Sequence, residues 1–309
     1  MKTGFVYDPI YLEHHWKGHP ENKDRLIAII QELERRGLLK ELVHINPRRA
    51  SAMEVSLNHD PAYVQEVADF CAGGGGYLDP DTYAVQSSYE VALHAVGGVL
   101  EGIDRLLNKE VDAVFCAVRP PGHHAEHSKA MGFCLFNNIA IGAHYLLQKG
   151  FERIFIVDFD AHHGNGTQRS FYEDDRVFYF SSHEYPFYPG TGSSKEKGAG
   201  KGYGSTHNEP LPAGAGDMEF DRIYGEVFPK LFYEYSPQFL LVSAGYDAHK
   251  DDPLTYLNLS TEGFGRLVSH LIESAKRFSI PILFALEGGY NLRALSECVS
   301  LTIQKLLEA

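Results

Sequence analysis

The sequence has few of the features that mark secreted, membrane-bound or disulfide-rich proteins. Its 309 residues include only four cysteines, and no two of them form a CxxC pair. This spacing excludes a disulfide scaffold and a cysteine zinc knuckle, and free thiols fit a reducing compartment. No apolar run is long enough to span a bilayer, and Asp8 and Glu13 interrupt the N-terminus before a signal-peptide core could form. We therefore expect a cytoplasmic protein without a membrane partner.

Basic residues are also scarce. Lysine and arginine together number 28 against 41 aspartates and glutamates, which gives a net charge of −13. Nucleic-acid-binding proteins usually carry a basic face, so this balance argues against a nucleic-acid partner. Hydrophobic residues make up 44% and charged residues 22%, which excludes a disordered or coiled-coil chain. A chain of this length is near the upper limit for one hydrophobic core, and we expect a single domain over residues 1–309.

Short apolar runs alternate with amphipathic helical patterns. The spacing of apolar residues predicts helices over residues 21–37, 88–107, 136–148, 218–234 and 261–277. Five apolar runs predict strands that are buried on both faces: Val111–Val118, Ile154–Phe159, Val177–Phe180, Phe239–Ser243 and Ile280–Leu286. The alternation predicts an α/β fold, in which helices flank a mostly parallel central sheet on both faces. The one glycine run, Gly73–Gly76, lacks the Lys-Ser/Thr ending of a phosphate-binding loop, and we expect a flexible turn there.

A polar cluster follows each predicted strand. In chain order the clusters are RPPGHH, DFDAHHGNG, SSH, SAGYDAH and EGGY. Ligands of open parallel sheets bind beyond the carboxyl ends of the strands, so these five clusters should converge on one site.

Asp160 and His162 are the first candidate metal ligands. Two residues apart in extended chain, their side chains point the same way, and a carboxylate with an imidazole suits zinc. Asp247, after the fourth strand, is a plausible third ligand, and three ligands with an open position describe a catalytic zinc site. Taken alone, an Asp-x-His pair is more often a helix cap beside a locally packed histidine.

The tandem histidines His123 and His124 can supply a base and an acid near neutral pH. Asp158 and Asn165 are candidates for orienting them. Tyr290, which two glycines can aim inward, could donate a hydrogen bond to a developing oxyanion. An isolated HH pair is more often a surface feature, and we assign the other pair, at residues 14 and 15, a structural role.

These motifs, in this order, resemble the zinc-dependent histone deacetylase family, which includes acetoin-utilisation and acetylpolyamine amidohydrolase members. The segments that carry the resemblance are His19-Pro20-Glu21 with Arg25, Asp81-Thr82-Tyr83, RPPGHH, GFCLFNN, DFDAHHGNGTQ, PGTG, SAGYDAH and EGGYNL. They span nearly the whole chain. Asn165 and the RPPGHH motif resemble the class II branch. The class I branch carries an aspartate at the position of Asn165.

The resemblance implies an arginase/deacetylase fold and removal of an acetyl group from an amine. It implies that Asp160, His162 and Asp247 bind zinc, which polarises the amide carbonyl and acidifies the attacking water. His124 would be the general base and acid beside His123, and Tyr290 would hydrogen-bond the amide oxygen. Asp158 would orient His123, and Asn165 would orient His124. The ligands of a structural potassium ion would map to Asp158, Asp160, His162, Ser181 and Ser182.

The resemblance further implies a narrow tunnel for an acyl-lysine stem. Phe133 and Tyr188 would form its walls with Gly132 and Gly288, and Leu254 would stand at its mouth. The apolar Leu254 favours acetylated lysine side chains over an acetylated small amine such as an acetylpolyamine, because polyamine-adapted members tend to place an acidic residue near the mouth.

Other readings stay open at this stage. Iron or cobalt could replace zinc, because such ligands select metals by geometry and supply. A two-manganese ureohydrolase is disfavoured, because Gly164 and Gly245 stand where its second metal needs carboxylates. A non-catalytic binding module is disfavoured, because no zinc ligand is missing. The sequence indicates no oligomeric state.

Overall fold

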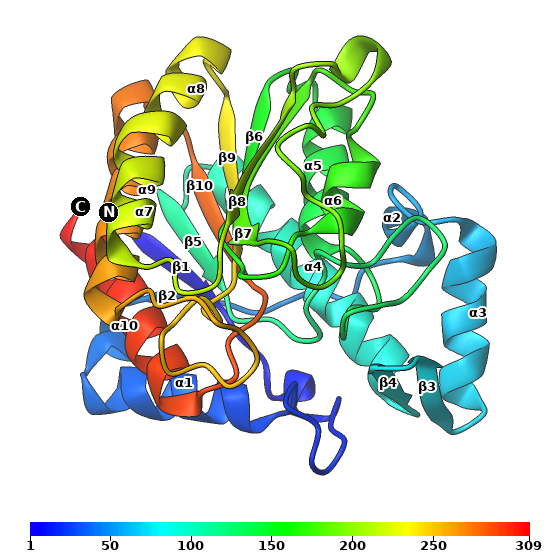
Figure 1. Cartoon of the computed structure of the whole chain (residues 1–309). Coiled ribbons are helices and arrows are strands. Elements are labelled where there is room, and N and C mark those ends of the chain that lie inside the picture. Colours follow the sequence, from blue (N-terminus) through cyan, green and yellow to red (C-terminus); the bar gives the residue numbers. More distant parts are fainter.

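Eight parallel strands form the central layer of the computed structural model, which describes residues 1–309 (Figure 1). The order across the sheet is β2-β1-β5-β10-β9-β6-β7-β8. The strands are β1 (Thr3–Val6), β2 (Val43–Ile45), β5 (Ala113–Cys116), β6 (Ile154–Asp158), β7 (Val177–Glu184), β8 (Thr206–Leu211), β9 (Phe239–Ala244) and β10 (Ile282–Leu286). The late strand β10 lies between β5 and β9 and pairs with both.

Helices cover both faces of the sheet (Figure 1). One layer contains α1 (Asp24–Arg35), α7 (Asp217–Arg222), α8 (Phe228–Tyr235), α9 (Thr261–Phe278) and α10 (Leu292–Glu308). The other contains α4 (Ser88–Leu107), α5 (Asn138–Gln148) and α6 (Asn165–Ser170). Beside α4 lie α2 (Ala52–Val55), α3 (Pro61–Ala72) and a two-stranded antiparallel ribbon of β3 (Gly75–Asp79) and β4 (Thr82–Val85).

The predicted α/β architecture is confirmed. Every residue of β5, β6, β9 and β10 is buried, because helices pack on both faces, and this explains why these strands are continuous apolar runs in the sequence. The main hydrophobic core contains 68 buried residues, and a second core of 15 lies around α3 and α4, so the larger core fixes the sheet that carries the site.

Three details of the sequence interpretation were wrong. The segment 218–234 is not one α-helix, because a π-helical stretch, Ile223–Val227, separates α7 from α8. Gly73–Gly76 is not simply a turn, because Gly75 begins β3; a Cβ there would lie 2.2 Å from the carbonyl oxygen of Ala84 on β4. The first helix begins at Asp24 rather than residue 21, because Glu21 turns into the protein interior.

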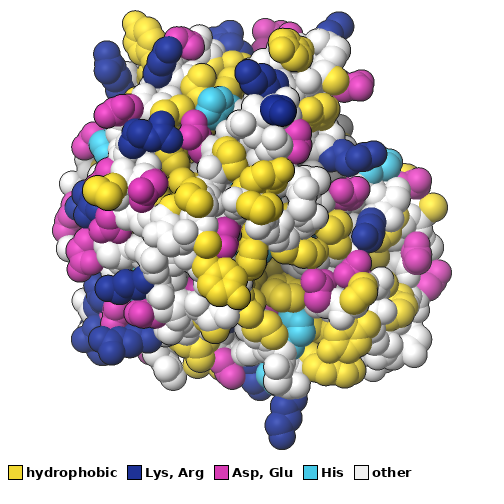
Figure 2. Space-filling model, in the orientation of Figure 1, with side chains coloured by type: hydrophobic (Ala, Val, Ile, Leu, Met, Phe, Trp, Pro, Cys, Tyr) yellow, Lys and Arg dark blue, Asp and Glu magenta, His cyan; other side chains and the backbone are white.

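None of the helices combines the length and apolar character that crossing a bilayer requires. On the face shown in Figure 2, lysine and arginine side chains are interspersed with aspartate and glutamate, and hydrophobic side chains gather near the centre. All four cysteines are buried free thiols.

Candidate active site

Three side chains at the carboxyl edge of the sheet form a compact group with the chemistry of metal ligands. Asp160 and His162 follow β6, and Asp247 follows β9. One ligand atom from each lies within 4.8 Å of the others. His162 Nδ1 is 2.8 Å from Asp247 Oδ2 and 3.2 Å from Asp160 Oδ1. The structure thus brings together the three residues nominated from the sequence, and two carboxylates with one imidazole suit zinc.

The charges of this group call for a cation. Burial and the neighbouring charge of Asp160 raise the pKa of Asp247 to about 7. Burial alone would lower the pKa of His162, but its hydrogen bonds to Asp160 and Asp247 raise it to about 10. Two carboxylates buried side by side repel each other unless a positive charge lies between them. A divalent ion supplies that charge, so the residues present fit a metal.

Backbone N–H groups and glycines hold the two carboxylates together. Gly288 N donates to Asp160 Oδ2 at 2.8 Å, and Ala161 N donates to Asp247 Oδ1 at 2.8 Å. A Cβ on Gly288 would lie 2.5 Å from Asp247 Oδ2 and 2.6 Å from Asp160 Oδ2. Both distances are too short for carbon against oxygen, so only glycine at this position lets the two side chains occupy their places.

The tandem histidines lie beside this group, each with its own orienting partner. His123 Nδ1 is 3.0 Å from Asp158 Oδ2, and His124 Nδ1 is 2.8 Å from Asn165 Oδ1. The two imidazole centroids are 4.0 Å apart, and that of His124 is 6.1 Å from that of His162. These are the pairings nominated from the sequence, and the catalytic roles stay predictions.

The two histidines have opposite acid–base character. Burial lowers the pKa of His124 well below its ordinary value, and the charges of His123 and His162 lower it further. Burial also disfavours the charged form of His123, but the charges of Asp158 and Asp160 raise its pKa well above its ordinary value. The surroundings therefore favour the neutral form of His124 and the protonated form of His123, which is how proteins separate a base from a cationic partner.

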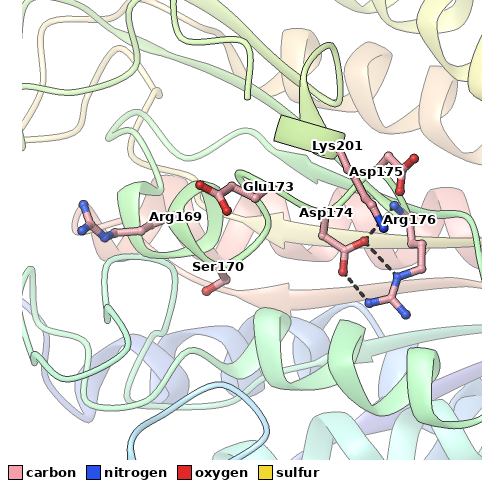
Figure 3. Close-up of a pocket in the computed structure, with 7 residues that line it drawn as sticks. All are labelled: Arg169, Ser170, Glu173, Asp174, Asp175, Arg176 and Lys201. Atoms are coloured by element: carbon pink, nitrogen blue, oxygen red, sulfur yellow. Dashed lines mark hydrogen bonds and ion pairs between the residues drawn. The ribbon is translucent and has the colours of Figure 1, made fainter. Parts of the chain in front are cut away.

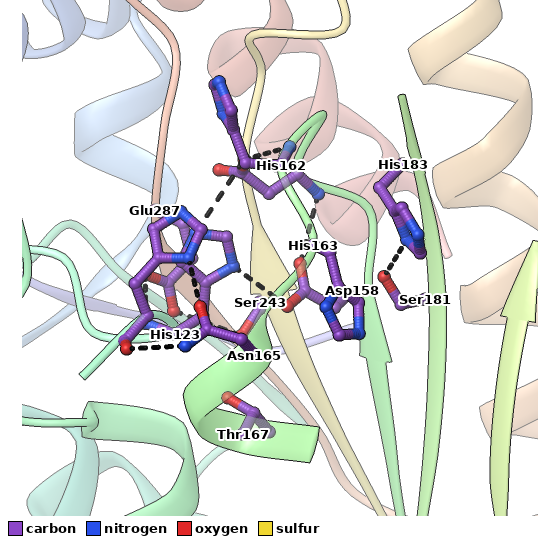
Figure 4. Close-up of polar contacts among 12 residues, drawn as sticks. His123, Asp158, His162, His163, Asn165, Thr167, Ser181, His183, Ser243 and Glu287 are labelled. Carbon is purple, nitrogen blue, oxygen red and sulfur yellow. Dashed lines mark hydrogen bonds and ion pairs between the residues drawn. The ribbon is translucent and has the colours of Figure 1, made fainter. Parts of the chain in front are cut away.

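Glu287, the residue directly after β10, supports the tandem histidines, a role that the sequence interpretation missed (Figure 4). Its Oε2 accepts hydrogen bonds from Gly122 N at 2.7 Å and His123 N at 3.1 Å, and its Oε1 accepts one from Ser243 Oγ at 3.1 Å. Burial raises the pKa of Glu287 to about 7. The available signal was its position as the first polar residue after the last buried run.

Tyr290 is held by the backbone of its loop and by Arg25. Its N–H donates to Asp252 Oδ2 at 2.7 Å, and the guanidinium carbon of Arg25 lies 5.1 Å from its ring centroid. Arg25 also donates to the carbonyls of Gly289 (2.7 Å) and Glu287 (2.5 Å). Burial raises the pKa of the Tyr290 phenol well above its ordinary value, so the hydroxyl keeps its proton and can donate it in a hydrogen bond.

A buried ion network fixes Arg25 in turn. Glu21 accepts from Arg25 Nη1 at 3.1 Å and from Arg119 through both Nε and Nη2. Burial would raise the pKa of Glu21, but the charges of Arg119 and Arg25 lower it to about 2. Arg119 Nη2 also donates to the carbonyl of His14, whose ring stacks on Tyr83 with centroids 4.3 Å apart. His14 is therefore a buried structural residue.

Two partly exposed aromatic side chains contact the site, one beside His124 and the other beside Tyr290. The Tyr188 ring centroid is 5.3 Å from that of His124, and the Phe133 centroid is 5.7 Å from that of Tyr290. Gly132 takes φ +56, and a Cβ on it would lie 2.3 Å from the His124 ring. Leu254 is half-buried, and its N–H donates to Asp252 Oδ1 at 2.9 Å. Its position at a tunnel mouth stays a prediction.

Two of the nominated potassium ligands, Asp160 and His162, belong to the metal-binding group, and the other three stand on β6 and β7. Ser181 on β7 is the register partner of Asp158 on β6. The Ser181 hydroxyl contacts His183 Nδ1 at 2.8 Å, and the Ser182 hydroxyl contacts the Tyr224 hydroxyl at 2.8 Å. Because both hydroxyls have partners within the protein, a potassium ion here would rely on main-chain carbonyls, and it stays a prediction.

A separate surface hollow of about 640 Å³ contains none of these residues (Figure 3). Its lining is entirely polar: Arg169, Ser170, Glu173, Asp174, Asp175, Arg176 and Lys201. Asp174 already pairs with Arg176 through contacts of 2.9 and 2.6 Å. We assign it no part in the chemistry.

Comparison with known proteins agrees with this geometry. A sequence model of the Histone deacetylase domain matches residues 19–306. A protein of Archaeoglobus fulgidus named "Probable deacetylase" is 40% identical over 296 residues, which cover 94% of this chain and 82% of that protein. "Histone deacetylase 14, chloroplastic" of Arabidopsis thaliana is 38% identical over 320 residues, which cover 96% of this chain and 74% of that protein.

The fold comparison gives the same result. A crystal structure described as the HDA15 HD domain superimposes with a TM-score of 0.94 at 35% sequence identity. The match covers 99% of this chain and 88% of that one. The match to the Histone deacetylase domain, over residues 19–306, spans every strand except β1 and includes the positions of Asp160, His162 and Asp247.

Proposed function

The chain belongs to the histone deacetylase family of amide hydrolases, and we propose that it is a zinc-dependent enzyme that removes acetyl groups from acetyl-lysine in proteins or peptides. We also propose that residues 1–309 act as one catalytic domain. The observation that carries the proposal is the grouping of Asp160, His162 and Asp247 beside His123 and His124, each of which has its own orienting partner. A hydrolase that must generate a nucleophile from water and protonate an amine needs this combination.

Asp160, His162 and Asp247 are the residues that would hold the zinc ion. When bound, zinc supplies Lewis-acid polarisation of the amide carbonyl and lowers the pKa of the attacking water. Iron or cobalt would fit the same oxygen and nitrogen donors. A structural potassium ion behind the site remains part of the proposal.

His124 handles the proton in this mechanism. With Nδ1 hydrogen-bonded to Asn165, its Nε2 is free to accept a proton from water during attack on the acetyl carbon. The same nitrogen then returns the proton to the departing amine, because a free amide anion is too poor a leaving group. Asp158 keeps His123 oriented and protonated, so its positive charge stabilises the negative charge that develops nearby.

Tyr290 completes the set by donating its hydroxyl proton in a hydrogen bond to the oxyanion. Phe133 and Tyr188 exclude water from the aliphatic stem of the substrate, whose burial contributes about 25 cal/mol per Å² of apolar surface. Leu254 is apolar and half-buried, and if it stands at the tunnel mouth, as the resemblance implies, it favours acetyl-lysine as the substrate.

A second candidate substrate is an acetylated polyamine. Burial raises the pKa of Tyr188 well above its ordinary value, and the charges of Asp81 and Asp79 raise it further, so two carboxylates lie near this wall. Carboxylates there would attract a second amine. They would equally attract a basic peptide, so this observation keeps the polyamine as an alternative. A cytoplasmic location is proposed from the free cysteines alone.

Acetate release is the deciding experiment. The zinc-loaded protein is given an acetyl-lysine peptide or an acetylated polyamine at equal concentration, with a chelator-treated sample as control. Chelator-sensitive turnover of the peptide supports the proposal. Preference for the polyamine keeps the mechanism and replaces the substrate, whereas turnover of neither substrate refutes both and favours a non-catalytic acyl-binding module.

A further inference from the structure

Glu126 extends the hydrogen-bonded chain that begins at His124. His124 Nδ1 contacts Asn165 Oδ1 at 2.8 Å, and Asn165 Nδ2 donates to Glu126 Oε1 at 3.0 Å. The backbone carbonyl of His124 is a weaker second acceptor for the same Nδ2, at 3.4 Å. Glu126 follows the tandem histidines by two residues and has no assigned function in the mechanism above.

The amide of Asn165 could face His124 in two ways. If Oδ1 faces the ring, it accepts from Nδ1–H, and His124 Nε2 is left with the lone pair that a base needs. If Nδ2 faces the ring, it donates to Nδ1, and the ring proton moves to Nε2, where the histidine can no longer act as a base. An aspartate would not present this choice, because both of its oxygens accept.

Glu126 removes the ambiguity. A carboxylate can only accept hydrogen bonds, so it must meet the Nδ2 side of the amide, and Oδ1 is then turned to His124. Asn165 is 6% exposed, but it borders a surface hollow of about 510 Å³ that Glu126 and Arg169 also line. Water can enter such a hollow, and water would satisfy either orientation of the amide. The His124 carbonyl at 3.4 Å and Met131 Sδ at 3.5 Å also accept from Nδ2, but Glu126 is the nearest acceptor, at 3.0 Å, and the only charged one.

We propose that Glu126 is a positioning residue that orients the Asn165 amide and thereby selects the Nδ1–H tautomer of His124. The inference deepens the proposed function and, for its kinetic consequence, rests on it. The tautomer itself is a property of the folded protein and is observable whether or not the substrate is identified.

The primary test is ¹⁵N NMR of the zinc-loaded, full-length protein labelled at histidine, with the His124 signals assigned by their loss in H124A. The unsubstituted protein should show the Nδ1–H form. Glu126→Ala should give a mixture with Nε2–H, whereas Glu173→Ala, a glutamate lining the same hollow, should leave the tautomer unchanged. An unchanged tautomer in Glu126→Ala would overturn the proposal.

The kinetic test compares the effect of Glu126→Ala in the unsubstituted protein and in the N165D variant. Glu126→Ala should lower kcat roughly 2-fold at constant KM, because about equal populations of the two amide orientations leave about half of the His124 rings in the Nδ1–H form. Glu126→Gln keeps an acceptor oxygen and should recover part of that loss. In the N165D background the new carboxylate accepts in either orientation and is repelled by Glu126, so Glu126→Ala should cause no further loss and should relieve that repulsion. Equal losses in both backgrounds would refute the proposal.

The two proposals can fail separately. If the unsubstituted protein releases no acetate from either substrate but the tautomer responds to Glu126→Ala, the proposed function fails and the inference stands. If acetate is released and the tautomer does not respond, the function stands and the inference fails.

Discussion

The substitution Glu21→Gln should destabilise the protein by about 3 kcal/mol at pH 7, because it removes the only carboxylate in contact with two buried guanidinium groups. Arg25, Arg119 and Glu21 all have side chains with 0% exposure. Removing one partner of a buried ion pair typically costs about 3–5 kcal/mol, because the remaining charge is left without compensation. Glutamine preserves the size of the side chain, so the change isolates the charge.

The pKa of Glu21 gives an independent value for the same quantity. The pKa is about 2 in the folded protein against 4.5 for an ordinary glutamate, and at 1.36 kcal/mol per unit the difference corresponds to about 3 kcal/mol. Because the folded-state value is the lower one, this stabilisation is complete above pH 4.5 and is lost as the pH falls toward 2. The Glu21→Gln protein should therefore lose less stability than the unsubstituted protein across that interval.

Urea unfolding followed by circular dichroism, at pH 7 and at steps between pH 5 and 3, measures both effects. With about 2.1 cal/mol/K of unfolding entropy per residue, a chain of this length should also show a Tm about 5 °C lower. The matched control is Glu32→Gln, since Glu32 likewise contacts two arginines, Arg35 and Arg36, but on the surface. Surface pairs contribute about 0–1 kcal/mol. The reasoning would be refuted if both variants lost the same small amount of stability and showed the same dependence of the unfolding free energy on pH below pH 5.

Three further outcomes are expected. Tyr290→Phe should lower kcat about 100- to 1000-fold with metal content and Tm unchanged, as measured by initial rates, elemental analysis and thermal unfolding. A kcat within about 3-fold of the unsubstituted enzyme would exclude the phenol from oxyanion stabilisation. Gly132→Ala should reduce activity by more than about 10-fold, because its Cβ would meet the His124 ring at 2.3 Å and its φ of +56 disfavours alanine; full activity would contradict the contact. Zinc at about 100 times its Kd should raise the free energy of unfolding by about 2.7 kcal/mol and Asp247→Asn should abolish the gain, whereas an unchanged gain would place the ion elsewhere.

The sequence predicted the centre of the sheet better than its edges. Strands β5, β6, β9 and β10 are buried on both faces and leave uninterrupted apolar runs. Edge strand β8 reads Thr-His-Asn-Glu-Pro-Leu, and edge strand β2 has only three residues, so neither produces that signal. The π-helical stretch in the middle of the segment 218–234 has an ordinary helical pattern, and its extra residue per turn depends on tertiary contacts.

Site residues that directly follow strands could be predicted from the sequence. Residues whose roles depend on contacts made only in the folded chain could not. Asp160, His162, Asp247 and His124 stand in polar clusters after buried runs, and parallel strands bring such clusters to one edge. Glu287 stands in the same kind of cluster. It accepts hydrogen bonds from Gly122 N and His123 N only because the loop after β5 folds back against it. Glu126 has no sequence signal, because only the folded chain brings it to Asn165.

The strand order has a consequence for how the protein is made. Of the eight strands of the sheet, β10 is translated last, although it lies between β5 and β9 and pairs with both. Until its residues leave the ribosome, the nascent chain holds two partial sheets, each with an apolar strand whose edge is unpaired. Unpaired apolar edges pair readily with other chains, so we expect the risk of aggregation to be greatest in this interval. The metal-binding group also forms late, because Gly288, whose N–H donates to Asp160, is translated directly after β10.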